Sequence, residues 1–241
     1  MEYFLIPHPD DETVNMLPSI LGANEKRIVF LTNAAPNFDE TFFREQGFVS
    51  REDYYLKRRA ETIRCAKLLG FTDEDIFLSE INDQELYKNL DNSLFELVEF
   101  SKTKKPSKVH SLCYEGQHSD HESSRMIAWY FSKLFNAELI EYSNNLVRVD
   151  IKNRVVDSNN FIVKKLSNIE LDLRKKLIIE VHKSQKLSMQ RYNENIYYRV
   201  AKNNDYSILF DKLLHMETMK YHFVDKQLMF DEFRKFEEKN G

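Results

Sequence analysis

The sequence predicts an α/β fold whose sheet is mostly parallel and covered by helices on both faces. Short apolar runs alternate with longer helical patterns over the first 140 residues, and several of the runs contain no polar alternation. Continuous apolar runs are typical of strands buried on both faces, and strand–helix alternation is typical of βαβ units. We therefore predict a Rossmann-like catalytic core over residues 1–145. A smaller C-terminal α/β appendage, residues 146–241, adds strands and helices that complete the same domain.

Five strands and four helices are expected in this core, in alternating order along the chain. The helix expected at 53–69 stops before Gly70, a residue typical of helix C-termini. Strands are predicted at 3–6, 27–32, 75–79, 108–113 and 137–142, and helices at about 12–22, 53–69, 90–103 and 121–135.

The stretch 33–52 interrupts this alternation, because it carries four phenylalanines without a clear period. Long loops in compact domains are often functional, so a lid or a substrate wall is one interpretation. Equally, these aromatic side chains could cover the sheet or form an oligomer contact.

The C-terminal part has a different pattern. Residues 146–150 and 161–166 are expected to pair as antiparallel strands across a polar turn at 152–160, and a long helix is expected at about 168–190. Three histidines fall on helical patterns in this part, where packing or surface roles are expected: His182, His215 and His222.

Composition limits the classes of partner. The 241 residues are 42% hydrophobic and 31% charged, as in ordinary globular proteins, and 35 basic and 39 acidic residues give a net charge of -4. No net basic field is available to attract nucleic acid or an anionic membrane. The sequence shows neither a signal peptide nor an apolar run long enough to span a bilayer, and Cys65 and Cys113 are expected to be free thiols. We expect a cytoplasmic protein, and leave open whether it forms a homo-oligomer.

Two clusters of metal-type ligands follow the first and fourth predicted strands: residues 8–12 (HPDDE) and residues 115–123 (EGQHSDHES). Ligands of open α/β sheets bind beyond the carboxyl ends of the strands. Imidazole and carboxylate groups together are typical ligands of a divalent transition metal, above all Zn²⁺. A metal would also relieve the repulsion between Asp10 and Asp11.

Helix capping is the alternative interpretation of these clusters. Asp is an ordinary N-cap residue, so Asp11 could cap the first helix and Asp120 the fourth. Capping explains either cluster alone better than it explains both. A dinucleotide site is excluded, because no G-x-G-x-x-G follows the first strand.

The motifs closely resemble those of the LmbE/PIG-L family of zinc-dependent de-N-acetylases, which show His-Pro-Asp-Asp-Glu and a later His-x-Asp-His. Here these motifs are PHPDDE and GQHSDH. The helix RRAETIRCAKLLGF (58–71), NDQEL (82–86) and HKSQ (182–185) extend the resemblance over about residues 1–190.

The resemblance implies a ligand set and a general base. His8, Asp11 and His121 would bind Zn²⁺, or Fe²⁺ or another divalent metal in its place, and Asp10 would be the base. The implied reaction removes the N-acetyl group from an N-acetylglucosamine-type sugar, so the implied partner is a small-molecule N-acetylated sugar. The same catalytic set would also serve an amidohydrolase acting on a non-sugar N-acyl compound. An inactive sugar-binding relative is less favoured, because every ligand and the base are present.

The resemblance also assigns supporting roles. His118 would donate a hydrogen bond to the developing oxyanion, with Asp120 holding its ring in the right tautomer. Arg58 and Asp83 would contact sugar hydroxyls. The sequence departs from some relatives in having Gly116 where they have a tyrosine, and the nearby Tyr114 is the candidate to replace it.

Overall fold

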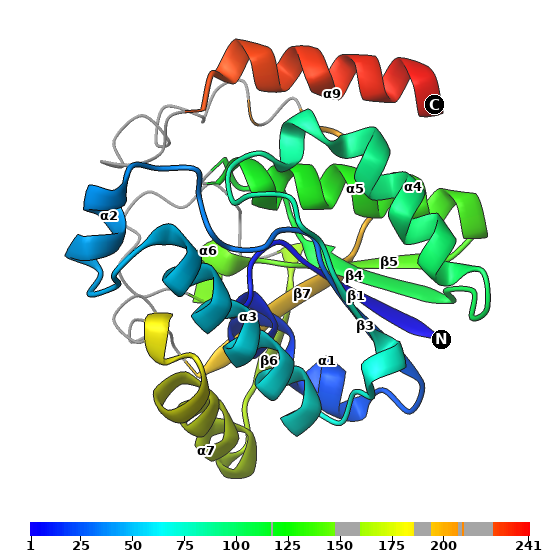
Figure 1. Ribbon diagram of the computed structural model, residues 1–241. Coiled ribbons are helices and arrows are strands. Elements are labelled where there is room, and N and C mark those ends of the chain that lie inside the picture. Colours follow the sequence, from blue (N-terminus) through cyan, green and yellow to red (C-terminus); the bar gives the residue numbers. More distant parts are fainter. Residues whose placement is uncertain (117, 148–159, 186–193, 207–208, 210–223) are drawn as a thin grey trace.

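The protein forms a seven-stranded sheet with helices on both faces, in a computed structural model that describes residues 1–116, 118–147, 160–185, 194–206, 209 and 224–241 (Figure 1). The strand order is β3-β2-β1-β4-β5-β7-β6. The strands are β1 (Glu2–Ile6), β2 (Lys26–Phe30), β3 (Ile76–Leu78), β4 (Lys108–Leu112), β5 (Glu138–Tyr142), β6 (Ile162–Lys165) and β7 (Asn195–Val200).

Strands β1 to β5 are parallel, and β6 and β7 extend the same sheet as antiparallel strands. The chain runs from β1 outward to β2 and β3, then returns to place β4 on the other side of β1. Connections from β1 and β4 therefore leave the sheet in opposite directions. Such a switch point is where open α/β sheets bind their ligands.

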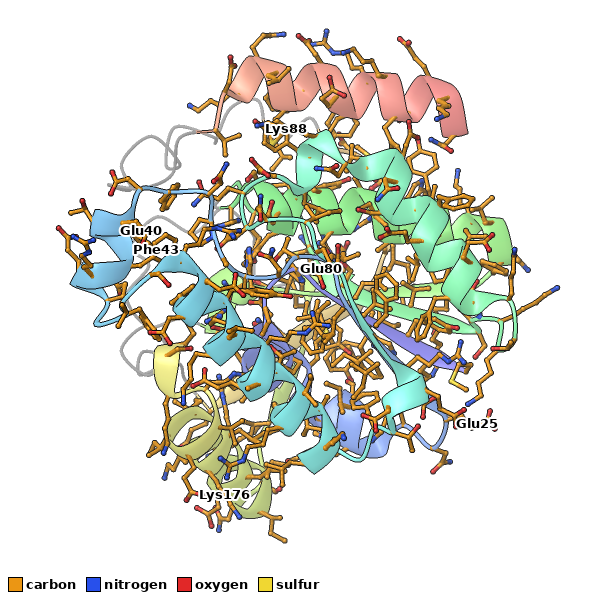
Figure 2. All side chains as sticks on the ribbon, viewed as in Figure 1. Glu25, Glu40, Phe43, Glu80, Lys88 and Lys176 are labelled. Carbon is orange, nitrogen blue, oxygen red and sulfur yellow. The ribbon has the colours of Figure 1, made fainter. Side chains whose placement is uncertain are left out.

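Alternating side chains of the strands supply the two halves of the core. In β1, Tyr3 and Leu5 face the layer of α4 (Leu90–Ser101), α5 (Ser119–Phe135) and α9 (Lys226–Asn240). Phe4 and Ile6 face the layer of α1 (Leu17–Gly22), α3 (Arg51–Leu68) and α7 (Asn168–Lys176). This alternation follows from the period of two in a strand. Figure 2 shows side chains filling the space between the sheet and both layers.

The helices are α1 (Leu17–Gly22), α2 (Glu40–Glu45), α3 (Arg51–Leu68), α4 (Leu90–Ser101), α5 (Ser119–Phe135), α6 (Asn144–Val147), α7 (Asn168–Lys176) and α9 (Lys226–Asn240). Single turns of π-helix occupy Glu12–Met16 and Leu177–Val181, and single 3₁₀ turns occupy Asp73–Asp75, Leu86–Lys88 and Lys183–Gln185. Among the residues that the structure describes, no helix combines the length and apolarity needed to cross a membrane.

The predicted fold class and the alternating core are confirmed, and each core strand lies within two residues of its predicted bounds. Cys65 and Cys113 are buried free thiols, as expected.

The predicted pairing in the C-terminal part is wrong. The segment expected to begin a strand at residue 146 instead ends α6, while 148–159 lie outside the described residues. The partner of β6 is β7, which the sequence analysis did not recognise as a strand.

The long helix predicted at 168–190 is also wrong in its extent. Helix α7 passes into a π-helical turn that ends at Val181, and a separate 3₁₀ turn follows. Residues 186–193 lie outside the described part of the chain, as do His215 and His222.

The stretch 33–52 contains a short helix that the sequence analysis missed. Asp39 caps α2 by accepting a hydrogen bond from the Thr41 amide (2.8 Å). Phe43 is fully buried against Tyr54 of α3, with ring centroids 5.5 Å apart. At least this aromatic side chain therefore covers the fold, as one of the two interpretations proposed.

Candidate metal and catalytic site

The two ligand clusters meet at the carboxyl edge of the sheet because β1 and β4 are adjacent parallel strands. Residues 8–12 follow β1 and enter the first helical turn, and residues 118–121 open helix α5 after β4. A buried carboxylate, Glu122, shapes the loop before α5 by accepting a hydrogen bond from the Gly116 amide (2.8 Å).

Three donor atoms of the predicted ligand set converge on one point. His8 Nδ1 lies 3.2 Å from His121 Nε2, and Asp11 Oδ2 lies 3.6 Å from the first atom and 3.4 Å from the second. Donors held at 2.0–2.2 Å from a tetrahedral ion stand about 3.3–3.6 Å apart. Each of these residues is no more than 9% exposed. The donor set therefore fits a divalent transition metal.

The Asp120 carboxylate contacts His8, whereas the sequence led us to expect it beside His118; the group of Asp120 that bonds to His118 is its backbone amide. Asp120 Oδ2 lies 3.1 Å from His8 Nε2, and the carboxylate also accepts from the amides of Gln84 (2.6 Å) and Leu86 (3.1 Å). Because a carboxylate only accepts, the proton of the neutral His8 ring belongs on Nε2. The lone pair of Nδ1 then faces Asp11 and His121, the arrangement that second-shell carboxylates impose on metal-binding histidines.

His118 lies beside this cluster. Its ring and the His8 ring meet edge to face, with their centroids 4.4 Å apart. Its Nδ1 accepts from the Asp120 amide (3.2 Å), which makes His118 the N-cap of α5. Its Nε2 lies 3.5 Å from Asp83 Oδ1, and the same Asp83 oxygen lies 3.2 Å from His8 Nε2. Asp83 thus faces both histidines.

Two overlapping sets of residues at this edge have the donor types and the proximity to hold a cation. One contains His8, His118 and His121, and the other combines His8 and His118 with Asp83 and Asp120. Asp120 already engages His8 Nε2, so His8 would bind a metal through Nδ1. We therefore favour the set described above, which joins His8 Nδ1 with Asp11 Oδ2 and His121 Nε2.

The capping alternative does not hold for either aspartate. The Asp11 side chain makes no capping hydrogen bond and instead accepts from the His8 amide (3.2 Å). The Asp120 side chain binds the segment before α4, as described above, and the N-cap of α5 is His118 instead.

Asp10 adopts an unusual backbone conformation beside the ligand cluster. Its φ of 132° is rarely adopted by residues other than glycine, and such conformations cost about 1–3 kcal/mol. The Asp10 amide donates to Glu12 Oε2 (2.8 Å), and Asp10 Oδ2 lies 3.8 Å from Arg58 Nη1.

Arg58 is buried behind this turn and is not presented openly to solvent. It is 4% exposed, and its Nη2 donates to the Pro9 carbonyl (3.0 Å). Arg58 therefore fixes the turn that carries Asp10. Tyr114, the candidate to replace the missing tyrosine, is buried and its hydroxyl donates to Asn204 Oδ1 (2.8 Å).

The electrostatics of the cluster favour a bound cation. Burial opposes charge on His8, but Asp83, Asp11 and Asp120 outweigh it and raise the pKa of His8 well above its usual value. Burial acts to raise the pKa of Asp11, yet His121 and His8 hold that pKa well below its usual range. The carboxylates thus attract positive charge to His8, and a metal ligand must give up its proton.

Burial raises the pKa of Asp10 to about 7, and the negative charge of Asp11 acts in the same direction. The Arg58 guanidinium lowers this pKa but does not outweigh the other two effects. A carboxyl group that exchanges its proton near neutral pH suits general acid–base chemistry.

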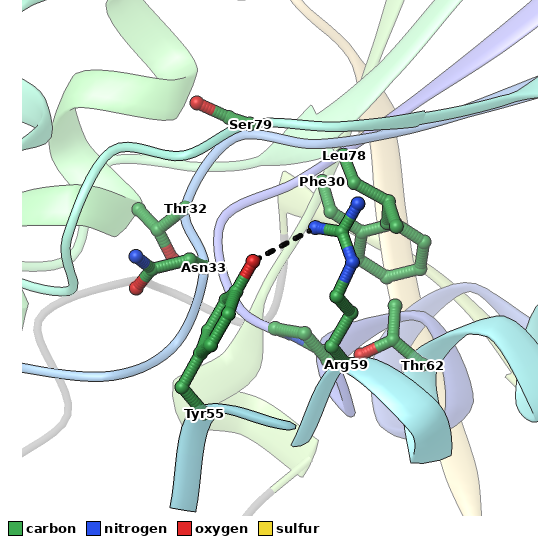
Figure 3. Close-up of a pocket in the computed structure, with 9 residues that line it drawn as sticks. Phe30, Thr32, Asn33, Tyr55, Arg59, Thr62, Leu78 and Ser79 are labelled. Carbon is green, nitrogen blue, oxygen red and sulfur yellow. Dashed lines mark hydrogen bonds between the residues drawn. The ribbon is translucent and has the colours of Figure 1, made fainter. Parts of the chain in front are cut away.

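A small hollow lies beside Pro9, between the ends of β2 and β3 and helix α3 (Figure 3). Arg59 Nη1 donates to the Tyr55 hydroxyl (3.1 Å), and both side chains bind Glu80 at 2.9 Å. Asn33 lines the same hollow. These hydroxyl, guanidinium and amide groups are suited to bind a polar molecule.

One buried cluster next to the site escaped the sequence analysis. Glu12, Cys65 and His182 bring their donor atoms within 4.8 Å of one another. The resemblance placed HKSQ on a later helix, but nothing local in the sequence links positions 12, 65 and 182.

A family model described as GlcNAc-PI de-N-acetylase (PIG-L) matches residues 3–131, which is more than half of the chain. No curated protein sequence matches the chain.

Several solved structures share the fold. A deacetylase from the teicoplanin biosynthesis pathway is 14% identical, with a TM-score of 0.63 over 84% of this chain and 100% of that chain. The deacetylase of the A40926 pseudoaglycone is 16% identical, with a TM-score of 0.62 over 84% of this chain and 98% of that chain. N,N'-diacetylchitobiose deacetylase from Pyrococcus horikoshii is 19% identical, with a TM-score of 0.57 over 83% of each chain.

Proposed function

This chain belongs to the GlcNAc-PI de-N-acetylase (PIG-L) family, and from that premise we propose that it is a metal-dependent hydrolase that removes the N-acetyl group from an N-acetylglucosamine-type sugar or glycoconjugate. The observation that carries the proposal is the convergence of His8 Nδ1, Asp11 Oδ2 and His121 Nε2 within 3.6 Å at the β1/β4 switch point, with Asp10 beside them. The names of the solved structures with this fold support an acetylated sugar as substrate, since one of them is an N,N'-diacetylchitobiose deacetylase and others are deacetylases of the teicoplanin pathway and of the A40926 pseudoaglycone.

His8, Asp11 and His121 would hold the metal, which we propose is Zn²⁺, because imidazole and carboxylate donors in a compact set suit that ion. Fe²⁺ or another divalent ion is the alternative. When bound, such an ion polarises the acetyl carbonyl and lowers the pKa of water. Asp120 fixes the His8 tautomer, so that Nδ1 is available as a donor.

Asp10 would act first as general base and then as general acid. Its carboxylate takes the proton of the attacking water, and the same proton passes to the leaving amine as the C–N bond breaks. The products are acetate and a free amino sugar. Arg58 holds the turn that carries Asp10 and stays near its carboxylate, so the carboxylate keeps its position through both transfers.

His118 would donate a hydrogen bond from Nε2 to the oxyanion that develops on the acetyl oxygen. Its Nδ1 already accepts from the Asp120 amide, which leaves the proton of the neutral ring on Nε2. Asp83, 3.5 Å from that nitrogen, orients the ring in the absence of substrate. We propose that Asp83 also accepts from a sugar hydroxyl.

The test is acetate release from a panel of substrates. N-acetylglucosamine, its alkyl glycosides and N,N'-diacetylchitobiose are compared with N-acetyl amino acids, with Asp10→Asn as the blank. We expect turnover of at least one acetylated sugar, and turnover by the blank that is lower by about 10²-fold or more. Turnover of the N-acetyl amino acids alone would replace the sugar by a non-sugar amide as substrate.

A further inference from the structure

Glu12, the last residue of the HPDDE motif, has both oxygens of its carboxylate engaged. Oε2 accepts from the Asp10 amide (2.8 Å). Oε1 lies 2.9 Å from His182 Nε2 and accepts from the Thr13 hydroxyl (3.1 Å) and the Cys65 thiol (3.2 Å). Glu12 is 0% exposed and His182 is 1% exposed. Because four groups hold the Glu12 carboxylate in place, the Asp10 amide that donates to it is held in place as well.

We propose that Glu12 and His182 are positioning residues, which hold the backbone of Asp10 in the conformation that aims its carboxylate at the metal cluster. This inference rests on the proposed function, in which Asp10 is the catalytic base. The Glu12 side chain bonds to the Asp10 amide and the His182 side chain bonds to Glu12, so both would act through Asp10.

The backbone of Asp10 needs such support. Its φ of 132° is a conformation that side-chain-bearing residues rarely adopt. The carbonyl of Asp10 is held by the first helical turn, where it accepts from the amides of Thr13 (3.0 Å) and Val14 (3.1 Å). The amide has no helical partner, and the Glu12 carboxylate supplies one. Strained backbone conformations of this kind persist where several surrounding contacts hold them in place.

His182 brings a distant segment of the chain to this task. It follows the π-helical turn Leu177–Val181 and precedes a 3₁₀ turn in which Ser184 Oγ donates to Glu61 of α3 (2.5 Å). The histidine is therefore anchored on both sides. Its Nε2 also supplies a hydrogen-bond donor that the fully buried Glu12 carboxylate needs.

A second metal site is the competing use of the same atoms. Glu12, Cys65 and His182 have donor types that bind Zn²⁺. Each of them is already satisfied by a hydrogen bond within the group, and the group is sealed from solvent. We therefore favour the hydrogen-bonded network, and the test below counts metal ions.

The test compares three variants of the metal-loaded enzyme. His182→Leu removes the partner of Glu12, and His182→Gln keeps a donor at nearly the same reach. The matched control is His110→Leu, because His110 is equally buried and its Nε2 lies 2.8 Å from Glu2 Oε2, a contact formed by the strands of the sheet and not by the site.

We expect His182→Leu to lower kcat by about 10- to 100-fold, because misplacing a catalytic group by about 1 Å has an effect of that order. The KM should change by less than about twofold and the metal content should stay at about one per chain, since the variant removes neither a ligand nor a substrate contact. His182→Gln should recover most of kcat. His110→Leu should lose thermal stability and keep kcat.

Amide hydrogen exchange of the segment 7–14 provides a readout that needs no substrate. His182→Leu should speed exchange in this segment relative to both wild type and His110→Leu. If His182→Leu does not fold, His182→Asn takes its place, because its shorter amide cannot reach Glu12.

Unchanged kcat and unchanged exchange in the His182 variant would overturn the inference. Two metal ions per chain in wild type, with one lost in Cys65→Ser, would overturn it in favour of a second metal site. If wild type releases no acetate from any acetylated compound, the proposed function fails, and the exchange comparison still decides whether Glu12 and His182 hold Asp10.

Discussion

Asp120→Asn tests whether the carboxylate of Asp120 sets the ligand atom of His8. The substitution keeps the size and shape of the side chain. Its amide nitrogen would turn toward one of the three donors that the carboxylate now accepts from, His8 Nε2 or the amides of Gln84 and Leu86. Placed at the Oδ2 position, the nitrogen faces His8 Nε2 and the Gln84 amide, while the Leu86 amide keeps its acceptor at Oδ1. The ring proton of His8 is then forced onto Nδ1.

The expected magnitude follows from that change. A proton on Nδ1 occupies the lone pair that would bind metal, so the His8 ring must change tautomer before it can act as a ligand. The free energy of that change reduces the affinity for metal. Substitutions of this kind in second-shell carboxylates weaken metal affinity by about 10- to 100-fold. This is about 1.4–2.8 kcal/mol of binding free energy. Losing Asp11 or His121 as a ligand should cost more, because a donor is removed outright.

Competition of the protein with a chromogenic chelator measures the metal Kd directly. The control is Glu141→Gln, which alters another buried carboxylate. Glu141 lies on β5 and accepts a hydrogen bond from Arg125 Nε (2.7 Å). We expect Asp120→Asn to bind metal 10- to 100-fold more weakly than wild type, and Glu141→Gln to bind as tightly as wild type. An unchanged Kd in Asp120→Asn would refute the assignment of His8 Nδ1 as a ligand held by Asp120.

Three further predictions concern the base, the oxyanion donor and stability. Asp10→Asn should keep its metal and lose about 10²–10⁴-fold in kcat, measured as acetate release, and near-normal turnover would exclude Asp10 as the base. His118→Ala should lose about 10²–10³-fold in kcat with metal retained, and a loss of metal instead would make His118 a ligand. Burial lowers the pKa of His110, and the hydrogen bond from His110 lowers that of Glu2. A group whose pKa is lower in the folded than in the unfolded protein stabilises the fold at pH values above its unfolded-state pKa. This contribution to the free energy of unfolding is lost as the pH falls, beginning below about 6.5, the unfolded-state pKa of histidine. Denaturant unfolding of wild type between pH 7 and 4 should show this decline and His110→Leu a shallower one, whereas equal slopes would contradict it.

The meeting of the two ligand clusters could be predicted from the sequence. Buried strands at 3–6 and 108–113 are evident from their apolar runs, and polar residues follow each of them directly. Parallel strands bring their carboxyl ends to one edge, so proximity follows from the fold class alone.

The partner of each carboxylate could not be predicted in the same way. Asp120 and His121 are successive residues in the first turn of α5, so their side chains point in directions about 100° apart. Which histidine each of them meets depends on how α5 is rotated against β1. That rotation is set by packing over the whole helix, so the sequence could not show that the Asp120 carboxylate meets His8 while its backbone amide meets His118.

The C-terminal strands show a second limit of local patterns. Residues 146–150 and 161–166 are close in sequence, which favoured a hairpin between them. The structure pairs β6 with β7 instead, although 29 residues separate the end of the first from the start of the second. Strand β7 is mostly half-buried and mixes polar with apolar residues, so it carries only a weak signal.

The most direct test of the account is acetate release as a function of added metal. Protein stripped of metal by a chelator is titrated with Zn²⁺, and turnover of an acetylated glucosamine glycoside is followed together with bound metal. The account predicts no turnover by the stripped protein and a rise that reaches its maximum near one ion per chain, with no bound metal and no turnover in His121→Ala. Full turnover by the metal-free protein, or one tightly bound ion in His121→Ala, would contradict the ligand set of His8, Asp11 and His121.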